Sequence, residues 1–247
     1  TYFATANEGD AREWGGYTDE VELKDLVKDG KVCDDLELPE GIEDKKFAGN
    51  LKLTNASGWN EEKECFDDLY SYGSRSFSIY DAEGNVVFDS GADFENITKD
   101  LPGLNFNADN EDPDFDDRSD NKGPEPEALT IGKVGDRTYA FIGAERVGGI
   151  FVYDVTTPAE AKFVTYVNNR DFSVGYDEDD VAATTKAGDL GPEGLAFVPA
   201  ADSPTDDALL IAGNEVSGTT TVFSIKDLLA DASDNADSPT ASGSSDG

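Results

Sequence analysis

The sequence predicts an all-β fold built from short antiparallel strands, and three observations support this. Its apolar residues occur in runs of four to six that are bounded by Gly, Pro or Asp, as strands usually are. The phrase Gly-Pro-Glu precedes such a run at Gly123–Glu125 and again at Gly191–Glu193. After each, a second apolar run ends in an acidic residue ahead of a glycine, at Glu145 and at Glu215. A supersecondary unit that recurs along a chain indicates a repeat architecture.

One complete unit can be followed from Glu127 to Val167. Its four apolar runs are Ala128–Ile131, Thr138–Ile142, Gly149–Tyr153 and Lys162–Val167. Four sequential strands within about 40 residues match one β-propeller blade. A parallel sheet would need crossover connections longer than any of these turns. The unit therefore predicts a β-propeller, with a plain meander inside a sandwich as the alternative.

About three to four four-stranded blades can be counted, together with long acidic loop insertions. The further strands expected are Tyr2–Ala6, Glu20–Leu23, Asn50–Thr54, Leu69–Tyr72, Ser76–Tyr80 and Val86–Asp89. Because a propeller closes with four to eight blades, we expect residues 1–229 to be the C-terminal part of a larger, seven-bladed ring. The missing N-terminal half would belong to the same or a separate chain. Residues 230–247, rich in Ser, Asp and Gly, are expected to be a disordered tail or linker.

Acidity is the outlying feature of the composition. The chain has 54 acidic and 19 basic residues, a net charge of −35 and a pI of about 4.1. Such a surface repels nucleic acid and anionic membranes and concentrates cations. Salt adaptation and an association with calcium or mineral both account for it, but lysine outnumbers arginine, which we do not expect after salt adaptation. No apolar run is long enough to cross a bilayer, so we expect neither nucleic-acid partners nor a direct membrane span.

The residue types present exclude several kinds of catalytic and metal site, and carboxylate oxygens remain as the candidate ligands for a metal ion. The chain has no histidine, which excludes Ser-His-Asp and Cys-His nucleophiles and a His-ligated zinc. It also has no Gly-rich phosphate cradle. Six carboxylates lie at predicted strand ends, in corresponding places of successive repeats: Glu8, Asp10, Glu127, Glu145, Glu193 and Glu215. In a propeller these ends converge on one channel mouth, where gathered carboxylates need a cation or an arginine among them.

Calcium and arginine are the two candidates for that positive charge. Arg12, Arg146 and Arg170 occur in the same phrases as the strand-end carboxylates and offer ion pairs. Calcium is favoured as the cofactor, because hard divalent cations take ligand sets made only of oxygen.

A second candidate calcium site lies in the acidic loop 105–121. Asp112, Asp114 and Asp116 alternate there, as ligands on an extended turn do. The loop is not an EF-hand, because Asp117 stands where the glycine is required and the twelfth position has no Glu. A solvated acidic loop is the alternative interpretation.

Seven phrases of the sequence resemble the C-terminal half of the choice-of-anchor I domain. They are TANEGDARE (Thr5–Glu13), SRSFSIYDAEGNVVFDSG (Ser74–Gly91), DDRSDNKGPEPEAL (Asp116–Leu129), TYAFIGAERVGGIFVYDV (Thr138–Val155), VNNRDFS (Val167–Ser173), DLGPEGLAFVPAADSP (Asp189–Pro204) and NEVSGTTTVF (Asn214–Phe223). The family includes mesenchyme-specific cell-surface glycoproteins of biomineralising animals and bacterial proteins labelled alkaline phosphatase-like. The resemblance runs from Thr1 to about Ile225 and implies an extracellular β-propeller, but no settled activity, because fold alone does not fix function.

Two inserts of this secreted-looking chain hold its cysteines, and two turns hold glycosylation sequons. Cys33 and Cys65 are predicted to form a disulfide, with two free thiols as the alternative. The sequons at Asn55 and Asn96 lie at predicted turns or loop edges, where an acceptor has to be exposed. Unmodified polar turns are the alternative.

Two functions follow. The first is a secreted or cell-surface acidic glycoprotein with a calcium-associated structural, adhesive or biomineralisation role, whose partners are other cell-surface or matrix proteins. The second is a calcium-dependent, alkaline phosphatase-like phosphoester hydrolase, in which carboxylates hold the metal and Arg146 or Arg170 stabilises the developing charge. The first is favoured over the enzyme, because the sequence identifies neither a nucleophile nor a metal-bound hydroxide.

Overall fold

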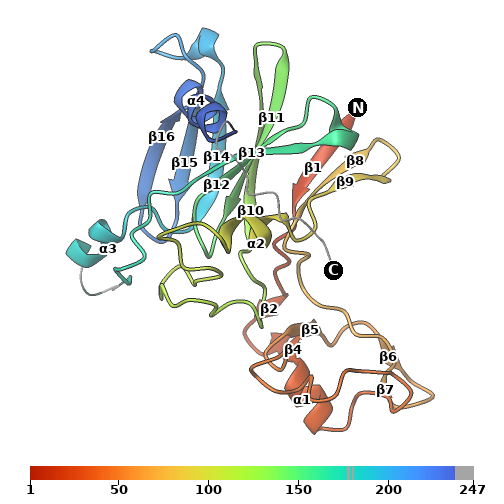
Figure 1. Ribbon diagram of the computed structural model, residues 1–247. Coiled ribbons are helices and arrows are strands. Elements are labelled where there is room, and N and C mark those ends of the chain that lie inside the picture. The colour runs from red at the N-terminus through yellow and green to blue at the C-terminus, as the bar shows by residue number, and fades with distance from the viewer. Residues whose placement is uncertain (177–178, 180, 237–247) are drawn as a thin grey trace, which may run out of the picture.

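The regular structure is mostly antiparallel sheet, which confirms the all-β prediction (Figure 1). A computed structural model of the chain describes residues 1–176, 179 and 181–236. Three larger sheets lie side by side in the upper part of Figure 1, and a small lobe extends below them. The described sheets do not close into a ring. The seven-bladed propeller therefore stays a prediction.

The three larger sheets have three, four and three described strands. The first has the order β1 (Tyr2–Ala6), β8 (Phe77–Asp81), β9 (Val86–Asp89). The second is β10 (Pro126–Val134), β11 (Arg137–Ala144), β12 (Ile150–Asp154) and β13 (Lys162–Val167). The third is β14 (Pro192–Val198), β15 (Leu209–Asn214) and β16 (Thr219–Ser224). The second sheet is the four-stranded unit that the sequence predicts. The other two have one strand fewer than expected.

The second sheet is buried on both faces, and β11 contributes to both cores. Ala140 and Ile142 pack with Phe77 and other side chains of the first sheet. Phe141, the residue between them, packs with Leu210 of the third sheet. Successive side chains of a strand point to opposite faces, so one apolar run serves two cores and stacks the three sheets against each other.

Residues 10–72 form the lobe, an insertion between β1 and β8. Its strands pair as β2 (Glu13–Trp14) with β3 (Tyr17–Thr18), β4 (Glu20–Glu22) with β5 (Lys52–Thr54), and β6 (Trp59–Asn60) with β7 (Cys65–Phe66). Leu23, Leu53 and Phe66 form its small core. Cys33 and Cys65 are bonded, with their Cα atoms 5.1 Å apart. A core this small depends on such a cross-link.

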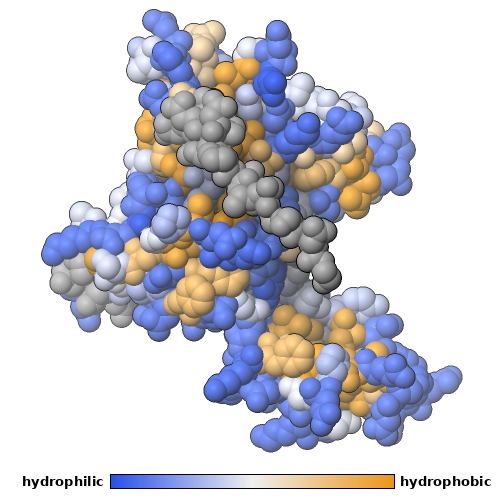
Figure 2. Space-filling model, in the orientation of Figure 1, coloured by the Kyte–Doolittle hydropathy of each residue, from blue (hydrophilic) through white to orange (hydrophobic). Residues whose placement is uncertain are grey.

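Hydrophilic residues cover most of the face shown in Figure 2, and hydrophobic residues gather between the sheets and on the lobe. In the described part of the chain, four short α-helices and two 3-10 turns accompany the strands, and the sequence predicted none of them. They are α1 (Leu23–Lys28), α2 (Asp93–Thr98), α3 (Val181–Ala187), α4 (Ile225–Ala236), Pro158–Glu160 and Ala200–Asp202.

Two predictions of secondary structure in the lobe differ from the structure. The strand predicted at 20–23 ends at Glu22, because Leu23 starts α1 and buries its side chain together with Leu26 on one helix face. The segment 69–72 makes only an isolated bridge to Leu53. Its neighbour β5 is three residues long, so no longer ladder can form along it.

Helix α4 extends into the segment that the sequence predicts as a disordered tail. Ile225 and Leu228 are buried on it, and the helix packs against β13 and β16. These apolar residues at helical spacing start the helix, and alanine, the best helix former, continues it. The structure therefore differs from the prediction over residues 230–236. The rest of that prediction, 237–247, lies outside the described residues.

The lobe joins the first sheet through two glycines whose backbones touch. A Cβ atom on Gly9 would lie 1.8 Å from the Gly73 nitrogen, and one on Gly73 would lie 2.2 Å from the carbonyl oxygen of Glu8. Both residues have positive φ, +80° and +66°. No other residue type fits at this contact, which we call the neck because it joins the lobe to the first sheet. It fixes the backbone directly beside Glu8.

We expect Gly9→Ala to lower the free energy of unfolding by about 2–5 kcal/mol, through steric overlap together with the left-handed backbone. Gly84→Ala is the matched control, because Gly84 has φ +86° and a Cβ added there would meet no atom within 4 Å. It should lose only the backbone contribution of about 1–2 kcal/mol. Urea unfolding measures both. Equal losses would contradict a close contact at the neck.

Candidate functional site: a hub of glutamates at the strand ends

Six glutamates, which we call the glutamate hub, gather where strands of the three sheets end. They are Glu8, Glu125, Glu127, Glu145, Glu193 and Glu215. The charges of Glu8, Glu125, Glu193 and Glu215 all act on Glu127, and those of Glu125 and Glu127 act on Glu145. The structure thus brings together five of the six strand-end carboxylates identified in the sequence. Asp10, the sixth, lies at the edge of the hub: it is exposed and accepts a hydrogen bond from the Ala11 amide, and its charge acts on Glu8.

The hub residues occupy matching positions in the second and third sheets. Glu127 and Glu193 each sit in a register shift at the start of the first strand. Glu145 and Glu215 directly follow the second strand. The Glu145 amide donates to the carbonyl oxygen of Glu125 at 2.8 Å, and the Glu215 amide donates to that of Gly191 at 2.7 Å. The same backbone geometry therefore places two carboxylates of the second sheet and two of the third sheet in the hub.

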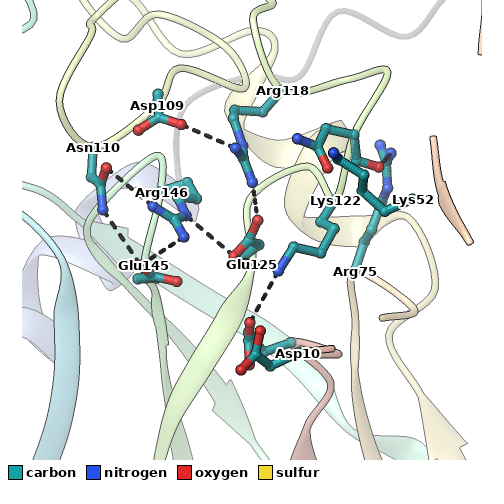
Figure 3. A network of polar contacts seen from close by, with 12 residues as sticks. Asp10, Lys52, Arg75, Asp109, Asn110, Arg118, Lys122, Glu125, Glu145 and Arg146 are labelled. Carbon is teal, nitrogen blue, oxygen red and sulfur yellow. Dashed lines mark hydrogen bonds and ion pairs between the residues drawn. The ribbon is translucent and has the colours of Figure 1, made fainter. Parts of the chain in front are cut away.

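Glu125 is the centre of the hub, and sequence reasoning missed it (Figure 3). Its side chain is 0% exposed and forms ion pairs with Arg118, with Lys122 at 3.4 Å and with Arg146 at 3.2 Å. Glu125 has a left-handed backbone, φ +49°. The repeated Gly-Pro-Glu phrase aligns Glu125 with Glu193, but in the structure its counterpart is Gly191, because the two sheets match two residues further along. The Gly-Pro-Glu phrase itself was the signal available.

The three cations of the hub link Glu125 to further acids. Arg118 also contacts Asp109 at 3.1 Å, and Arg146 contacts Glu145 at 3.2 Å. Lys122 contacts Glu8 at 3.4 Å, which joins the first sheet to the second. Arg118 and Lys122 come from the connection between α2 and β10. This acidic segment therefore supplies positive charge to the hub.

Of the three arginines predicted to pair with the strand-end carboxylates, only Arg146 does so. Arg12 pairs instead with Asp19 in the lobe, at 2.6 Å. Arg170 is 7% exposed and donates to the carbonyl oxygen of Arg146 at 2.9 Å. Its guanidinium also lies over the ring of Phe172. Arg170 therefore supports the backbone behind the hub.

The acidic loop does not gather its aspartates into a cation site. Asp112, Asp114 and Asp116 are all exposed. Asp116 accepts a hydrogen bond from the Ser119 hydroxyl within the loop. Among the described residues, the group whose ligand atoms lie within 4.8 Å of one another is Glu8, Glu125 and Glu145. Arg118 connects the loop to the hub through its ion pairs with Asp109 and Glu125.

Both sequon asparagines are exposed, but only one lies in a turn. Asn55 follows β5, and its amide donates to the carbonyl oxygen of Thr18 at 3.5 Å. Asn96 lies within helix α2, which corrects the expected loop. The helix forms there because Phe94 is fully buried and the Thr98 hydroxyl donates back to its carbonyl oxygen at 2.8 Å.

Burial and mutual repulsion raise the pKa values of Glu8, Glu127 and Glu145. Burial raises the pKa of Glu127 to about 7, and Glu8, Glu193 and Glu215 add to this. Burial raises the pKa of Glu145 to about 8, against the opposing effect of Arg146. If all six glutamates were ionised, they would carry three more charges than Arg118, Lys122 and Arg146 supply. A proton or a bound cation relieves that repulsion.

Glu8, Glu125 and Glu145 have the chemistry of a calcium site. Their carboxylate oxygens approach within 4.8 Å of one another, and calcium takes oxygen ligands in flexible geometry. Arg118, Lys122 and Arg146 already compensate part of this charge, so a bound ion would act in addition to these ion pairs. Calcium and arginine, the two candidate sources of positive charge, are therefore both compatible with this hub.

An acid with a raised pKa weakens folding as pH rises. Between about pH 4.5 and 8, folded Glu127 and Glu145 keep protons that the unfolded chain releases, so stability falls with increasing pH. We expect the melting temperature in chelator to fall from pH 5 to pH 8. Glu127→Gln should flatten that slope, whereas Glu13→Gln, at an exposed site, should leave it unchanged. Parallel melting curves for the two variants would contradict the raised pKa.

Stacked antiparallel sheets, a disulfide-linked lobe and a strongly acidic surface define an extracellular or cell-surface all-β domain. The chain belongs to the choice-of-anchor I domain family, whose model matches residues 1–158. It is 29% identical over 169 residues to Gigasin-3a of Magallana gigas. That match covers 66% of this chain and 59% of the relative. No solved structure matches the chain significantly.

These findings confirm the family resemblance and an extracellular or cell-surface location. The family model covers the first sheet, the lobe and the first strands of the second sheet. No helix in the described part of the chain is long and apolar enough to cross a membrane.

Proposed function

We propose that the chain is a structural module of a secreted or cell-surface acidic glycoprotein, in which the glutamate hub binds calcium and holds the stacked sheets together. One observation carries this proposal: matching strand ends from different sheets bring their carboxylates to one place. Acids placed only for solubility would have no reason to follow the strand repeat. The strongly negative surface supports an adhesive or mineral-associated role, because it concentrates calcium around the module.

The proposed architecture is part of a β-propeller. Blades of a propeller are four-stranded sheets arranged around a central channel, and β10 lies against both β14 and β1. The carboxylates that face this meeting point would line the channel mouth. Calcium there would be held by Glu8, Glu125 and Glu145, with Glu127 beside them. Glu8 comes from the first sheet and Glu145 from the second, so one ion would clamp two sheets.

Calcium should therefore raise the melting temperature. Extracellular calcium modules bind with dissociation constants of about 0.1–1 mM, so 10 mM calcium should add about 3–10 °C relative to chelator at equal ionic strength. Glu8→Gln should remove most of this gain, because it deletes a ligand and keeps the side-chain shape. Asp112→Asn, in the exposed loop, is the matched control and should keep it. Identical melting in calcium and chelator would leave the ion pairs alone to hold the hub.

The glycoprotein part of the proposal rests on Asn55 and Asn96, both of which are exposed. Treatment of the protein from its native source with an amidase that removes N-glycans should lower its mass. Asn55→Gln and Asn96→Gln should each remove part of that change when the chain is expressed in a secretory host. An unchanged mass would refute glycosylation without affecting the calcium proposal.

A further inference from the structure

Strand β1 matches β11 and β15 in position but has one neighbour fewer. The residue at the end of each strand pairs with the strand that follows: Asn7 donates to Ser76 at 3.0 Å, Ala144 donates to Gly149 at 3.1 Å, and Asn214 is in register with Thr219. A hub glutamate comes next in all three sheets. β11 has β10 on its other side and β15 has β14, whereas β1 pairs only with β8 among the described strands. One edge of β1 is therefore open.

The missing neighbour leaves one face of β10 partly uncovered. On the face toward the third sheet, Phe197 of β14 packs directly on Gly132, where an added Cβ would lie 2.2 Å from the ring. On the opposite face, Leu129 is half-buried in the first core, but Ile131 is 44% exposed. The third sheet thus covers β10 with a first strand. The first sheet has no first strand with which to do so.

An apolar groove occupies the place where such a strand would lie. Its volume is 380 Å³, and it is lined by Tyr2, Phe3 and Ala4 of β1 together with Ile131 of β10. Tyr2 and Phe3 are 55% and 51% exposed, although both lie in a strand. Figure 1 shows β1 beside β10, with β8 and β9 on its other side. An open strand edge beside exposed apolar side chains is a site for strand addition.

We propose that the open edge of β1 binds an antiparallel strand of the kind formed by β10 and β14. These two strands begin Pro-Glu-Ala-Leu and Pro-Glu-Gly-Leu, and they are the first strands of their sheets. Each places its glutamate in the hub and its leucine, Leu129 or Leu195, in a core between sheets. The added strand would likewise bring one carboxylate beside Glu8. In the arrangement of β10, the strand's alanine and threonine would face Ile131 across the groove, and its leucine and isoleucine would lie beside Phe3 on the other face.

The occupant is a Pro-Glu-(Ala/Gly)-Leu segment from outside residues 1–247. Both segments of this chain with that pattern are already paired, β10 with β11 and β14 with β15. A second copy of the chain therefore has no free strand of this kind to offer. The inference rests on the propeller arrangement proposed above, but it is independent of calcium.

A synthetic nine-residue peptide with the sequence of β10, PEALTIGKV, tests the proposal. Fluorescence anisotropy with the full chain, in chelator and in calcium, should show saturable binding. Hydrogen exchange should show new protection at the amides of β1. A peptide with aspartate in place of both its alanine and its threonine should bind at least about tenfold more weakly, because these positions would face the apolar groove.

The chain variant Ile131→Asp should weaken binding of the unmodified peptide by at least about tenfold. Val222→Asp, on the exposed face of β16, is the matched control and should bind as the parent does. Unchanged melting behaviour in calcium checks that both variants fold.

No saturable binding, or equal binding by the two variants, would overturn the proposal. So would a dimer whose β1 amides are protected without peptide, because a second copy would then occupy the edge. In each case the calcium response is measured separately, so the proposed function can stand when strand addition fails.

Discussion

The buried carboxylate of Glu125 constrains the structure around it. A charge taken out of water without a partner costs several kcal/mol, and a pair recovers that cost only with good geometry. Glu125 therefore requires its cations, and the chain supplies Arg118, Lys122 and Arg146. The long connection between α2 and β10 has to fold back to place the first two. Lys122 then reaches Glu8, at the end of the first sheet. Local charge compensation in this way fixes how the sheets meet.

The hub contains more carboxylates than cations, and this excess affects the pKa values of its acids. Glu127, Glu145 and Glu8 all have raised pKa values, because burial and neighbouring acids disfavour their charged forms. A site arranged for stability alone would carry fewer acids. Excess carboxylate at a junction of sheets makes the junction sensitive to pH, and in the proposed function calcium would strengthen it. For a protein outside the cell, calcium binding of this kind would couple the cohesion of the sheets to the surrounding ion concentration.

The repeat unit and its carboxylates could be predicted from the sequence, because both follow the strand period. The four runs between Ala128 and Val167 are the strands of the second sheet, and Glu127, Glu145, Glu193 and Glu215 converge because strand ends in matching units lie together. Glu125, the centre of the hub, has no such regularity, since the matching residue is Gly191.

The conformation of the acidic loop could not be predicted from the sequence, because irregular segments have no strand or helix period. The spacing of Asp112, Asp114 and Asp116 suggested ligands around an ion, but Arg118 turns inward to Glu125 and leaves these aspartates in solvent. Which side chain of an irregular segment is buried depends on distant partners, which spacing does not reveal. Short helices such as α1 were missed because two leucines in six residues carry too little periodicity.

The most direct test of the account is a double-mutant cycle on Arg118 and Glu125, measured by urea unfolding at pH 7 in chelator. Arg118→Met and Glu125→Gln should each lower the free energy of unfolding by about 1.5–3 kcal/mol, because each removes a charge-assisted contact that the remaining ion pairs of Glu125 do not replace. The double variant should lose less than the sum of the two by at least about 1.5 kcal/mol, since it leaves neither charge of the pair uncompensated. Losses that add within about 0.5 kcal/mol would show that the two residues act independently and that this ion pair does not hold the sheets together.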